Sequence, residues 1–233
     1  MSKIFFLLIA ITLVLSTPTI SQKKFDLSVY TGSGISFLGG SGATNKSYYI
    51  IGDVVRLDEM KNPYGKKPLT NFFAGLQAKM LLPSNYMLML STQYEQTGGR
   101  LTADSILYLG FSRVDGKYKR NYDFISVNPE IGRTILQKKV KLVLHTGLDY
   151  AFKLSLKDQF DYTDQSCKKY SIRNQGMNPE TNDLRFTIGS SITRKRWTLD
   201  LNYKHGLSNY NKNGNDKVFS RLLHIRLIYT FLK

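Results

Sequence analysis

The sequence predicts an all-β protein, an eight-stranded antiparallel transmembrane up-and-down β-barrel with short periplasmic turns and long extracellular loops. Three observations predict this fold. Eight segments alternate between apolar and polar side chains with the period of two that strands have. The connections between these segments alternate between long and short. The apolar faces begin or end in aromatic residues, which is typical of a barrel surrounded by lipid.

The N-terminal segment has the composition of an export signal. Lys3 is followed by an apolar run over 4–15 and then by the small-residue sequence Thr19-Ile20-Ser21. This order predicts a cleaved signal peptide over 1–21 and a barrel domain over 22–233. The run is shorter than the ~20 apolar residues that a membrane-spanning helix needs.

Composition narrows the choice of exported protein. The single cysteine, Cys167, excludes an internal disulfide framework, which small secreted domains usually need. The net charge is +16, and removal of the signal peptide with Lys3 leaves 16 − 1 = +15. For an exported protein the natural counterpart of this charge is anionic lipid headgroups or polysaccharide rather than nucleic acid. The alternative is that the charge only keeps the loops soluble.

The N-terminal half of the chain supplies four of the eight predicted strands. In the second of them, Phe72, Ala74 and Leu76 share one face, while Phe73, Gly75 and Gln77 share the other. Pro129 removes a ladder donor from the fourth strand, so a bulge is expected there. These strands cover 24–37, 71–82, 86–95 and 121–133.

The C-terminal half supplies the other four strands. The segment 140–154 has the longest regular alternation in the chain. The closing segment 221–233 places Leu223, Ile225 and Leu227 on one face and His224 and Arg226 on the other. The predicted strands of this half cover 140–154, 184–192, 197–204 and 221–233.

Short and long connections alternate along the chain, as they do in outer-membrane barrels. Short turns are predicted at 83–85, 134–139 and 194–196, and longer connections at 38–70, 98–120, 155–183 and 208–219. Because outer-membrane barrels have short periplasmic turns and longer external loops, both chain ends are expected on the periplasmic side.

The two faces of the strands predict which side meets lipid. An eight-stranded barrel has an interior that side chains fill, so charges on the inward face must pair there and close the lumen to conduction. The predicted inward charges are Lys79, Glu95, Glu130, Lys141, Asp149, Arg185, Asp200, Lys204 and Arg226. The predicted aromatic girdle comprises Phe72, Tyr86, Tyr94, Tyr150, Phe152, Trp197, Tyr203, Tyr229 and Phe231.

Glu130 and Lys141 flank one short turn on the same face. We therefore expect antiparallel pairing to bring them within about two residues of register. This register predicts that they belong to one charge cluster in the lumen, with a structural role.

Three stretches resemble a known group of proteins. They are the strand around Gly75-Leu76, the sequence Tyr203-Lys204-His205-Gly206-Leu207-Ser208-Asn209, and the terminal Tyr229-x-Phe231-x-Lys233. With the architecture, they make the chain from Lys24 to Lys233 similar to small outer-membrane β-barrel proteins of the Bacteroidota type, the PorT-like group. The resemblance implies an outer-membrane barrel whose aromatic last strand is recognised by the insertion machinery. It also implies, as an alternative role, membership of a secretion complex.

No catalytic, cofactor-binding or metal-binding residue is predicted. His145 and His224 lie on polar faces, where packing in the lumen accounts for them, and no metal-ligand spacing appears. His205 and Ser208 invite comparison with small barrels that deacylate lipid A through a Ser-His pair, with Asp216 as a nearby carboxylate. Residues three apart in a strand point to opposite faces, which disfavours that pair.

The long connections leave several alternatives open. The sequences Tyr48-Tyr49-Ile50-Ile51 and Ile106-Leu107-Tyr108-Leu109 are apolar runs amid basic residues. They are strands that extend above the membrane, a second pairing that makes ten strands, or a surface for a partner or glycan. Cys167 lies in the third long connection and is expected to be incidental. The basic residues in these connections include Lys66, Lys67, Lys117, Lys119 and Arg120.

The predicted function is a structural or interaction role in the cell envelope, without catalysis and without a cofactor. The alternatives are an accessory component of a secretion or envelope-assembly complex, a lipid-modifying enzyme, and a passive pore. The predicted partners are outer-membrane lipid and lipopolysaccharide, together with envelope or secretion-system proteins; nucleic acid is not among them.

Overall fold

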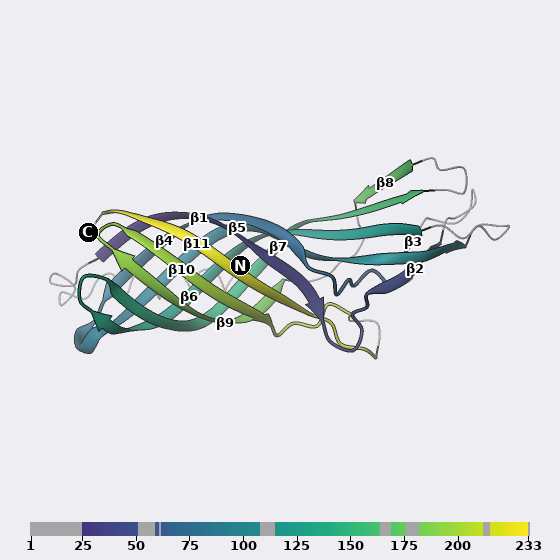
Figure 1. Ribbon diagram of the computed structural model, residues 1–233. Coiled ribbons are helices and arrows are strands. Elements are labelled where there is room, and N and C mark those ends of the chain that lie inside the picture. The colour runs from purple at the N-terminus through teal and green to yellow at the C-terminus, as the bar shows by residue number, and fades with distance from the viewer. Residues whose placement is uncertain are drawn as a thin grey trace, which may run out of the picture.

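The computed structural model describes residues 25–50, 59–60, 62–107, 115–163, 169–175, 182–211 and 215–232. Eight antiparallel strands close into a ring in the order β1–β4–β5–β6–β7–β9–β10–β11, and β11 pairs with β1 (Figure 1). The predicted eight-stranded up-and-down barrel is confirmed. The strands of the ring are β1 (Phe25–Gly39), β4 (Leu69–Leu81), β5 (Tyr86–Leu107), β6 (Asp115–Gln137), β7 (Lys141–Thr163), β9 (Asp183–Arg194), β10 (Trp197–Gly206) and β11 (Phe219–Leu232).

One end of the barrel, here named the turn end, carries the short connections. They are the 3-10 turn η2 (Pro83–Asn85) and the turns at 138–140 and 195–196. Ser84 and Asn85 have φ angles of 59° and 66°, a left-handed conformation that asparagine tolerates better than most residues. The opposite end, named the loop end, carries the longer connections, as predicted.

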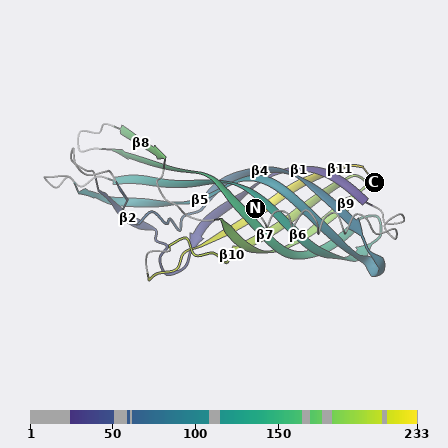
Figure 2. The same ribbon diagram turned by 180° about the vertical axis from the view of Figure 1, so that it is seen from behind.

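The strands β5, β6 and β7 run well past the ring at the loop end. They contain 22, 23 and 23 residues, roughly twice the length that crosses a membrane. Their outer parts form a projecting sheet, visible in both views (Figures 1 and 2), which we name the extension sheet. It comprises 98–107, 115–123 and 155–163, with β2 (Lys46–Ile50), β3 (Glu59–Met60) and β8 (Lys169–Gln175).

The extension sheet decides between the alternatives for the long connections. Much of 98–120 and 155–183 is strand, so the alternative of strands extending above the barrel is confirmed. A ring of ten strands is wrong, because β2 pairs in parallel with the outer part of β5 and β8 pairs only along the outer part of β7. Residues 51 and 108–109 of the two apolar runs lie outside the described residues, as do Cys167 and the predicted signal peptide.

The orientation of the two faces is as predicted. Leu76, Leu199 and Ile225 each expose 55% of their surface on the outside of the barrel. The predicted inward charges Glu95, Asp149 and Arg185 are 0% exposed. Exposed aromatic side chains lie near both ends of this apolar band, among them Tyr86 and Trp197 at the turn end. A surface of this kind is favourable against lipid and costly in water.

The bulge predicted at Pro129 is wrong. Pro129 is opposite Leu90 of β5, and the register with β7 is continuous from Val127 to Glu130. The shifts in this ladder lie instead between Asp123 and Phe124 and between Thr134 and Leu136. The missing donor of Pro129 is therefore accommodated without an extra residue.

Gly189 makes room for His145 inside the barrel. A Cβ atom at Gly189 would lie 2.5 Å from Cε1 of the His145 ring. Replacing Gly189 by Leu should therefore destabilise the barrel by about 1–3 kcal/mol through overpacking. Urea unfolding of the refolded protein in detergent measures the change. Ser190→Leu is the matched control, since the neighbouring residue lies on the outward face; equal losses in both variants would contradict the assignment of faces.

Candidate functional site

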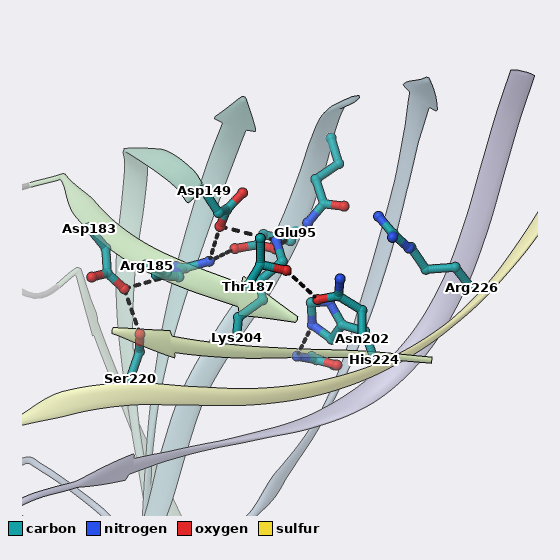
Figure 3. Close-up of polar contacts among 12 residues, drawn as sticks. Glu95, Asp149, Asp183, Arg185, Thr187, Asn202, Lys204, Ser220, His224 and Arg226 are labelled. Carbon is teal, nitrogen blue, oxygen red and sulfur yellow. Dashed lines mark hydrogen bonds and ion pairs between the residues drawn. The ribbon is translucent and has the colours of Figure 1, made fainter. Parts of the chain in front are cut away.

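Five charged side chains form an ion cluster in the lumen, toward the loop end (Figure 3). Arg185 donates from Nε to Asp183 Oδ2 at 2.6 Å and from Nη1 to Asp149 Oδ2 at 3.2 Å, and it also pairs with Glu95. The Nζ of Lys204 lies 3.0 Å from Glu95 Oε2 and 3.1 Å from Asp149 Oδ2. We name these residues the loop-end cluster. Their side chains come from β5, β7, β9 and β10 and are almost completely buried.

The connection after β10 and the strands β6 and β11 complete the loop-end cluster. The hydroxyl groups of Tyr210 and Ser220 donate to Asp183 Oδ2 at 2.8 Å and 2.6 Å. The guanidinium of Arg185 lies 4.9 Å from the ring centroid of Phe124, a cation–π contact. Asp183 was not singled out from the sequence. Its signal is the Asp-x-Arg spacing, which puts both side chains on one face of a strand and allows them to pair.

A second ion cluster lies toward the turn end. His145 places Nδ1 3.0 Å from Glu130 Oε1 and Nε2 2.7 Å from Asp200 Oδ2. Arg226 donates from Nε to Asp200 Oδ1 at 2.7 Å, and its Nη2 lies 3.8 Å from Glu130 Oε2. Because a carboxylate can only accept, both ring nitrogens of His145 fit the role of donor. We name Glu130, His145, Asp200 and Arg226 the turn-end cluster; a protonated His145 balances its charge.

Neutral side chains fill the space between the two clusters. Asn202 accepts from Thr187 Oγ1 at 3.0 Å and donates to Glu130 Oε1 at 3.3 Å. The rings of Phe73 and His224 stack with their centroids 4.2 Å apart. Tyr30 donates to Gln93 at 2.9 Å and lies under Arg226. Every strand of the ring thus contributes side chains to the contacts inside the lumen.

The sequence prediction for Glu130 and Lys141 is half right. Both side chains face the lumen, but the predicted register is wrong, because Glu130 is opposite Gly147 and Lys141 is opposite Gln137. The strand β6 continues to Gln137, so the turn is shorter than predicted and the two residues are farther apart along the ladder. Glu130 pairs with His145 and Arg226 instead.

Lys141 belongs to a cavity at the turn end of the lumen. The cavity has a volume of about 380 Å³, and Asp200 of the turn-end cluster is part of its wall. Lys79, also predicted to face inward, lines it and pairs with Asp26 at 3.3 Å. The remaining walls combine apolar side chains, among them Met87, Met89 and Val143, with hydroxyl and amide groups such as those of Thr198 and Gln77.

The structure does not bring the considered hydrolase residues together. Ser208 Oγ accepts from the backbone N–H of Leu184 at 3.0 Å. His205 lies 3.2 Å from the hydroxyl of Tyr203 through Nδ1. Asp216 is an exposed residue whose backbone carbonyl accepts from Asn211. In these hydrogen bonds, none of the three residues has another member of the suggested Ser-His-Asp set as its partner.

The described part of the chain offers neither a cluster of metal ligands nor a membrane-spanning helix. It contains no group of three or more His, Cys, Asp or Glu residues arranged to hold a metal ion. Its helices include none that is long and apolar enough to cross a bilayer.

The inward face of the extension sheet is packed against the loop-end connections. Tyr122 and Leu156 are buried in a cluster that also contains Tyr64, Tyr210 and Val218. These contacts fix the sheet to the barrel.

An ion pair crosses the same inward face. Arg120 donates to Asp158 through Nε at 2.7 Å and through Nη2 at 2.6 Å. Burial alone would lower the pKa of Arg120, but the hydrogen bonds to Asp158 outweigh it and raise the pKa well above the ordinary value. Arg120 is therefore a permanent cation that is already engaged.

Comparison with known proteins identifies no family for this chain. No protein-family model matches the chain, and no curated protein sequence matches it. The chain is similar to Ail, the attachment invasion locus protein of Yersinia pestis, in a crystal structure with the heparin analogue sucrose octasulfate. The identity is 13%, the match covers 89% of this chain and 99% of Ail, and the TM-score is 0.39.

A second similar structure is that of Neisserial surface protein A, with 11% identity over 88% of this chain and 97% of that chain and a TM-score of 0.40. Likenesses this weak assign no function to this chain.

Proposed function

We propose that this chain is an outer-membrane β-barrel with a structural or interaction role in the cell envelope and no catalysis. The observation that carries the proposal is that large apolar side chains lie on the outside of the barrel and ionised side chains lie inside, the reverse of a water-soluble protein. Burying one such apolar side chain is worth about 1.5–3 kcal/mol, so an aqueous location would forfeit that energy at many positions. The sequence of 1–21 supports export through a signal peptide.

The location has a direct test. In fractionated cells the protein should pellet with the outer membrane, resist carbonate extraction and dissolve only in detergent. Mass spectrometry of the mature chain should place its N-terminus at Gln22. Recovery of the folded protein from the aqueous periplasmic or culture fraction would overturn the proposal.

The packed lumen predicts that the barrel does not conduct ions. In a planar bilayer the refolded protein should show no stepwise conductance, because two ion clusters and the Phe73–His224 stack occupy its cross-section. A matched control is a known open porin refolded by the same procedure. Reproducible unitary steps from this protein would favour the passive pore instead.

The proposed absence of catalysis can be tested by substituting His205 and Ser208, the pair compared above with lipid A deacylases. Lipid A extracted from cells expressing His205→Ala or Ser208→Ala should have the same acyl composition as lipid A from cells expressing the unaltered protein. A difference between these lipids would assign the chain to the lipid-modifying enzymes.

The extension sheet supports an interaction role more specifically. Strands of 22 and 23 residues continue well beyond the apolar band. About 10 residues are enough to cross a bilayer, so the additional length is not required for membrane insertion. The partners we propose are outer-membrane lipid and lipopolysaccharide around the barrel, with envelope proteins at the sheet. An accessory place in a secretion or assembly complex of the PorT-like kind is the alternative, and stable co-purification of such machinery from detergent-solubilised envelope would favour it.

A further inference from the structure

The outward face of the extension sheet carries a row of basic side chains. The register aligns Arg100 of β5 with Lys119 of β6, Lys119 with Gln159 of β7, and Gln159 with Arg173 of β8. Neighbouring strands lie about 4.8 Å apart, so this row crosses four strands within about 15 Å. Among the described residues, none of its three cations forms an ion pair, in contrast to Arg120 on the opposite face.

The next row toward the sheet's tip contains a hollow of about 450 Å³. Lys117 and Lys169 line it with the hydroxyl-bearing residues Thr102, Thr163 and Ser171. Its acidic residue, Asp161, is opposite Lys117 in the ladder and accepts from the side-chain amide of Gln159 at 2.9 Å. Cations and hydroxyl groups side by side suit a ligand that combines anionic groups with sugar hydroxyls.

One contact in the row is unfavourable for the fold itself. Arg100 and Lys119 are directly opposite each other in an antiparallel ladder, and like charges in such a pair destabilise a sheet. Anions bound between the two side chains would remove this repulsion. The guanidinium of Arg100 also donates from Nε to the backbone carbonyl of Pro68 at 2.8 Å, so a bound anion would meet an anchored cation at this end of the row.

The distance of the row from the apolar band distinguishes lipid phosphates from glycans as the anionic partner. Ile125 is the last exposed large apolar residue of β6 before the extension, among the residues described. At ~3.3 Å per residue, Lys119 lies about 20 Å farther along the strand, or about 15 Å above the apolar band for a strand tilted by ~40°. The headgroup layer is only about 5–8 Å thick on each side of a bilayer. The row therefore lies beyond lipid phosphates, at the level of a glycan.

We propose that the face formed by Arg100, Lys117, Lys119, Lys169 and Arg173 binds an anionic glycan that carries sulfate or phosphate esters. The esters contact the cations of the row, and the sugar hydroxyls contact the hollow at Lys117. The inference rests on the proposed function only in placing this face outside the cell. Binding by the purified barrel tests the site, and labelling of intact cells tests the placement separately.

The experiment measures binding of a sulfated hexasaccharide to the refolded full-length barrel in detergent by titration calorimetry. Lys117→Glu/Lys119→Glu should weaken binding at least about tenfold, because charge-dependent contacts are lost and reversed. The double variant should remain folded, since the carboxylate introduced at position 119 would face Arg100 across the ladder and replace a repulsive pair by an attractive one. This gain offsets the repulsion between the carboxylate introduced at position 117 and Asp161 directly opposite it. Raising the salt concentration should weaken binding by the unaltered protein.

Two controls keep the result specific. Lys138→Glu/Lys139→Glu makes the same change in net charge at exposed positions of the turn end, and it should leave the affinity within about twofold, since the added charges lie more than a Debye length away. Uncharged maltohexaose should not bind. Equal losses in both double variants, equal binding of maltohexaose, or no binding of the sulfated hexasaccharide by the unaltered barrel would each overturn the proposal.

Discussion

Replacing Arg185 by Met is expected to prevent most of the protein from reaching the folded barrel. Arg185 is completely buried and contacts Glu95, Asp149 and Asp183. Without it, Glu95 and Asp149 would keep Lys204 as a partner cation, and Asp183 would keep only the hydroxyl groups of Tyr210 and Ser220. Removing one partner from a buried ion cluster costs about 3–5 kcal/mol. That is a large part of the roughly 5–15 kcal/mol that typically separates folded from unfolded states. Gel migration of unheated samples and urea unfolding after refolding into detergent measure the loss.

The companion variants separate charge from shape. Arg185→Lys retains the charge but loses the planar fork of donors, so its stability should lie between those of Arg185→Met and the unaltered protein. Adding Asp183→Asn to Arg185→Met should recover part of the loss, because one uncompensated carboxylate is removed. A folded yield of Arg185→Met equal to that of the unaltered protein would contradict the account of the lumen.

The second large effect is expected on the opposite face. Ile225→Arg should destabilise the barrel by about 2–4 kcal/mol, the cost of a cationic side chain at the middle of the lipid-facing surface. Ile225 is 55% exposed and is paired with Leu201 and Ser33, well away from either end of its strand. Urea unfolding in lipid vesicles is the measurement.

Phe231→Arg is the matched control, since Phe231 lies on the outward face near the turn end. The same side chain should cost only about 0–1 kcal/mol near the interface. In a soluble protein with a surface exposed to water, neither substitution would cost much. A neutral Ile225→Arg would therefore contradict the lipid-facing assignment.

The alternation of side chains made the barrel predictable, because period two directly reports which residues share a face. The closing strand illustrates this, since Leu223, Ile225 and Leu227 are all exposed and His224 and Arg226 are buried. The short turns were also predictable, because Pro83-Ser84-Asn85 has turn chemistry.

The extension sheet and the register at Glu130 could not be predicted in the same way. In β6 the inward-facing residue Arg120 is buried and hydrogen-bonded to Asp158. Because charged residues occur on both faces of the extension sheet, the alternation of polar and apolar residues does not show which face is buried there. A turn of three residues after Gln137 and a shift near Thr134 moved Glu130 away from Lys141. Neither is visible in a pattern of period two.

The membership of the ion clusters was only partly predictable. The sequence shows which charges face inward, but the partners come from distant strands, as in the contact between Glu95 and Arg185. Which inward charges meet depends on the stagger of eight strands, and each register shift changes it.

The orientation of the apolar face toward lipid is tested most directly by the single tryptophan of the chain. Trp197 is 53% exposed on the outward face at the turn end and lies against Tyr229, with ring centroids 4.8 Å apart. When the protein is refolded into vesicles of brominated lipids, Trp197 emission should be strongly quenched, more by bromines near the headgroup than by bromines near the chain ends. Aqueous acrylamide should quench it weakly. Emission unaffected by brominated lipids but quenched by acrylamide would contradict the orientation on which every assignment above depends.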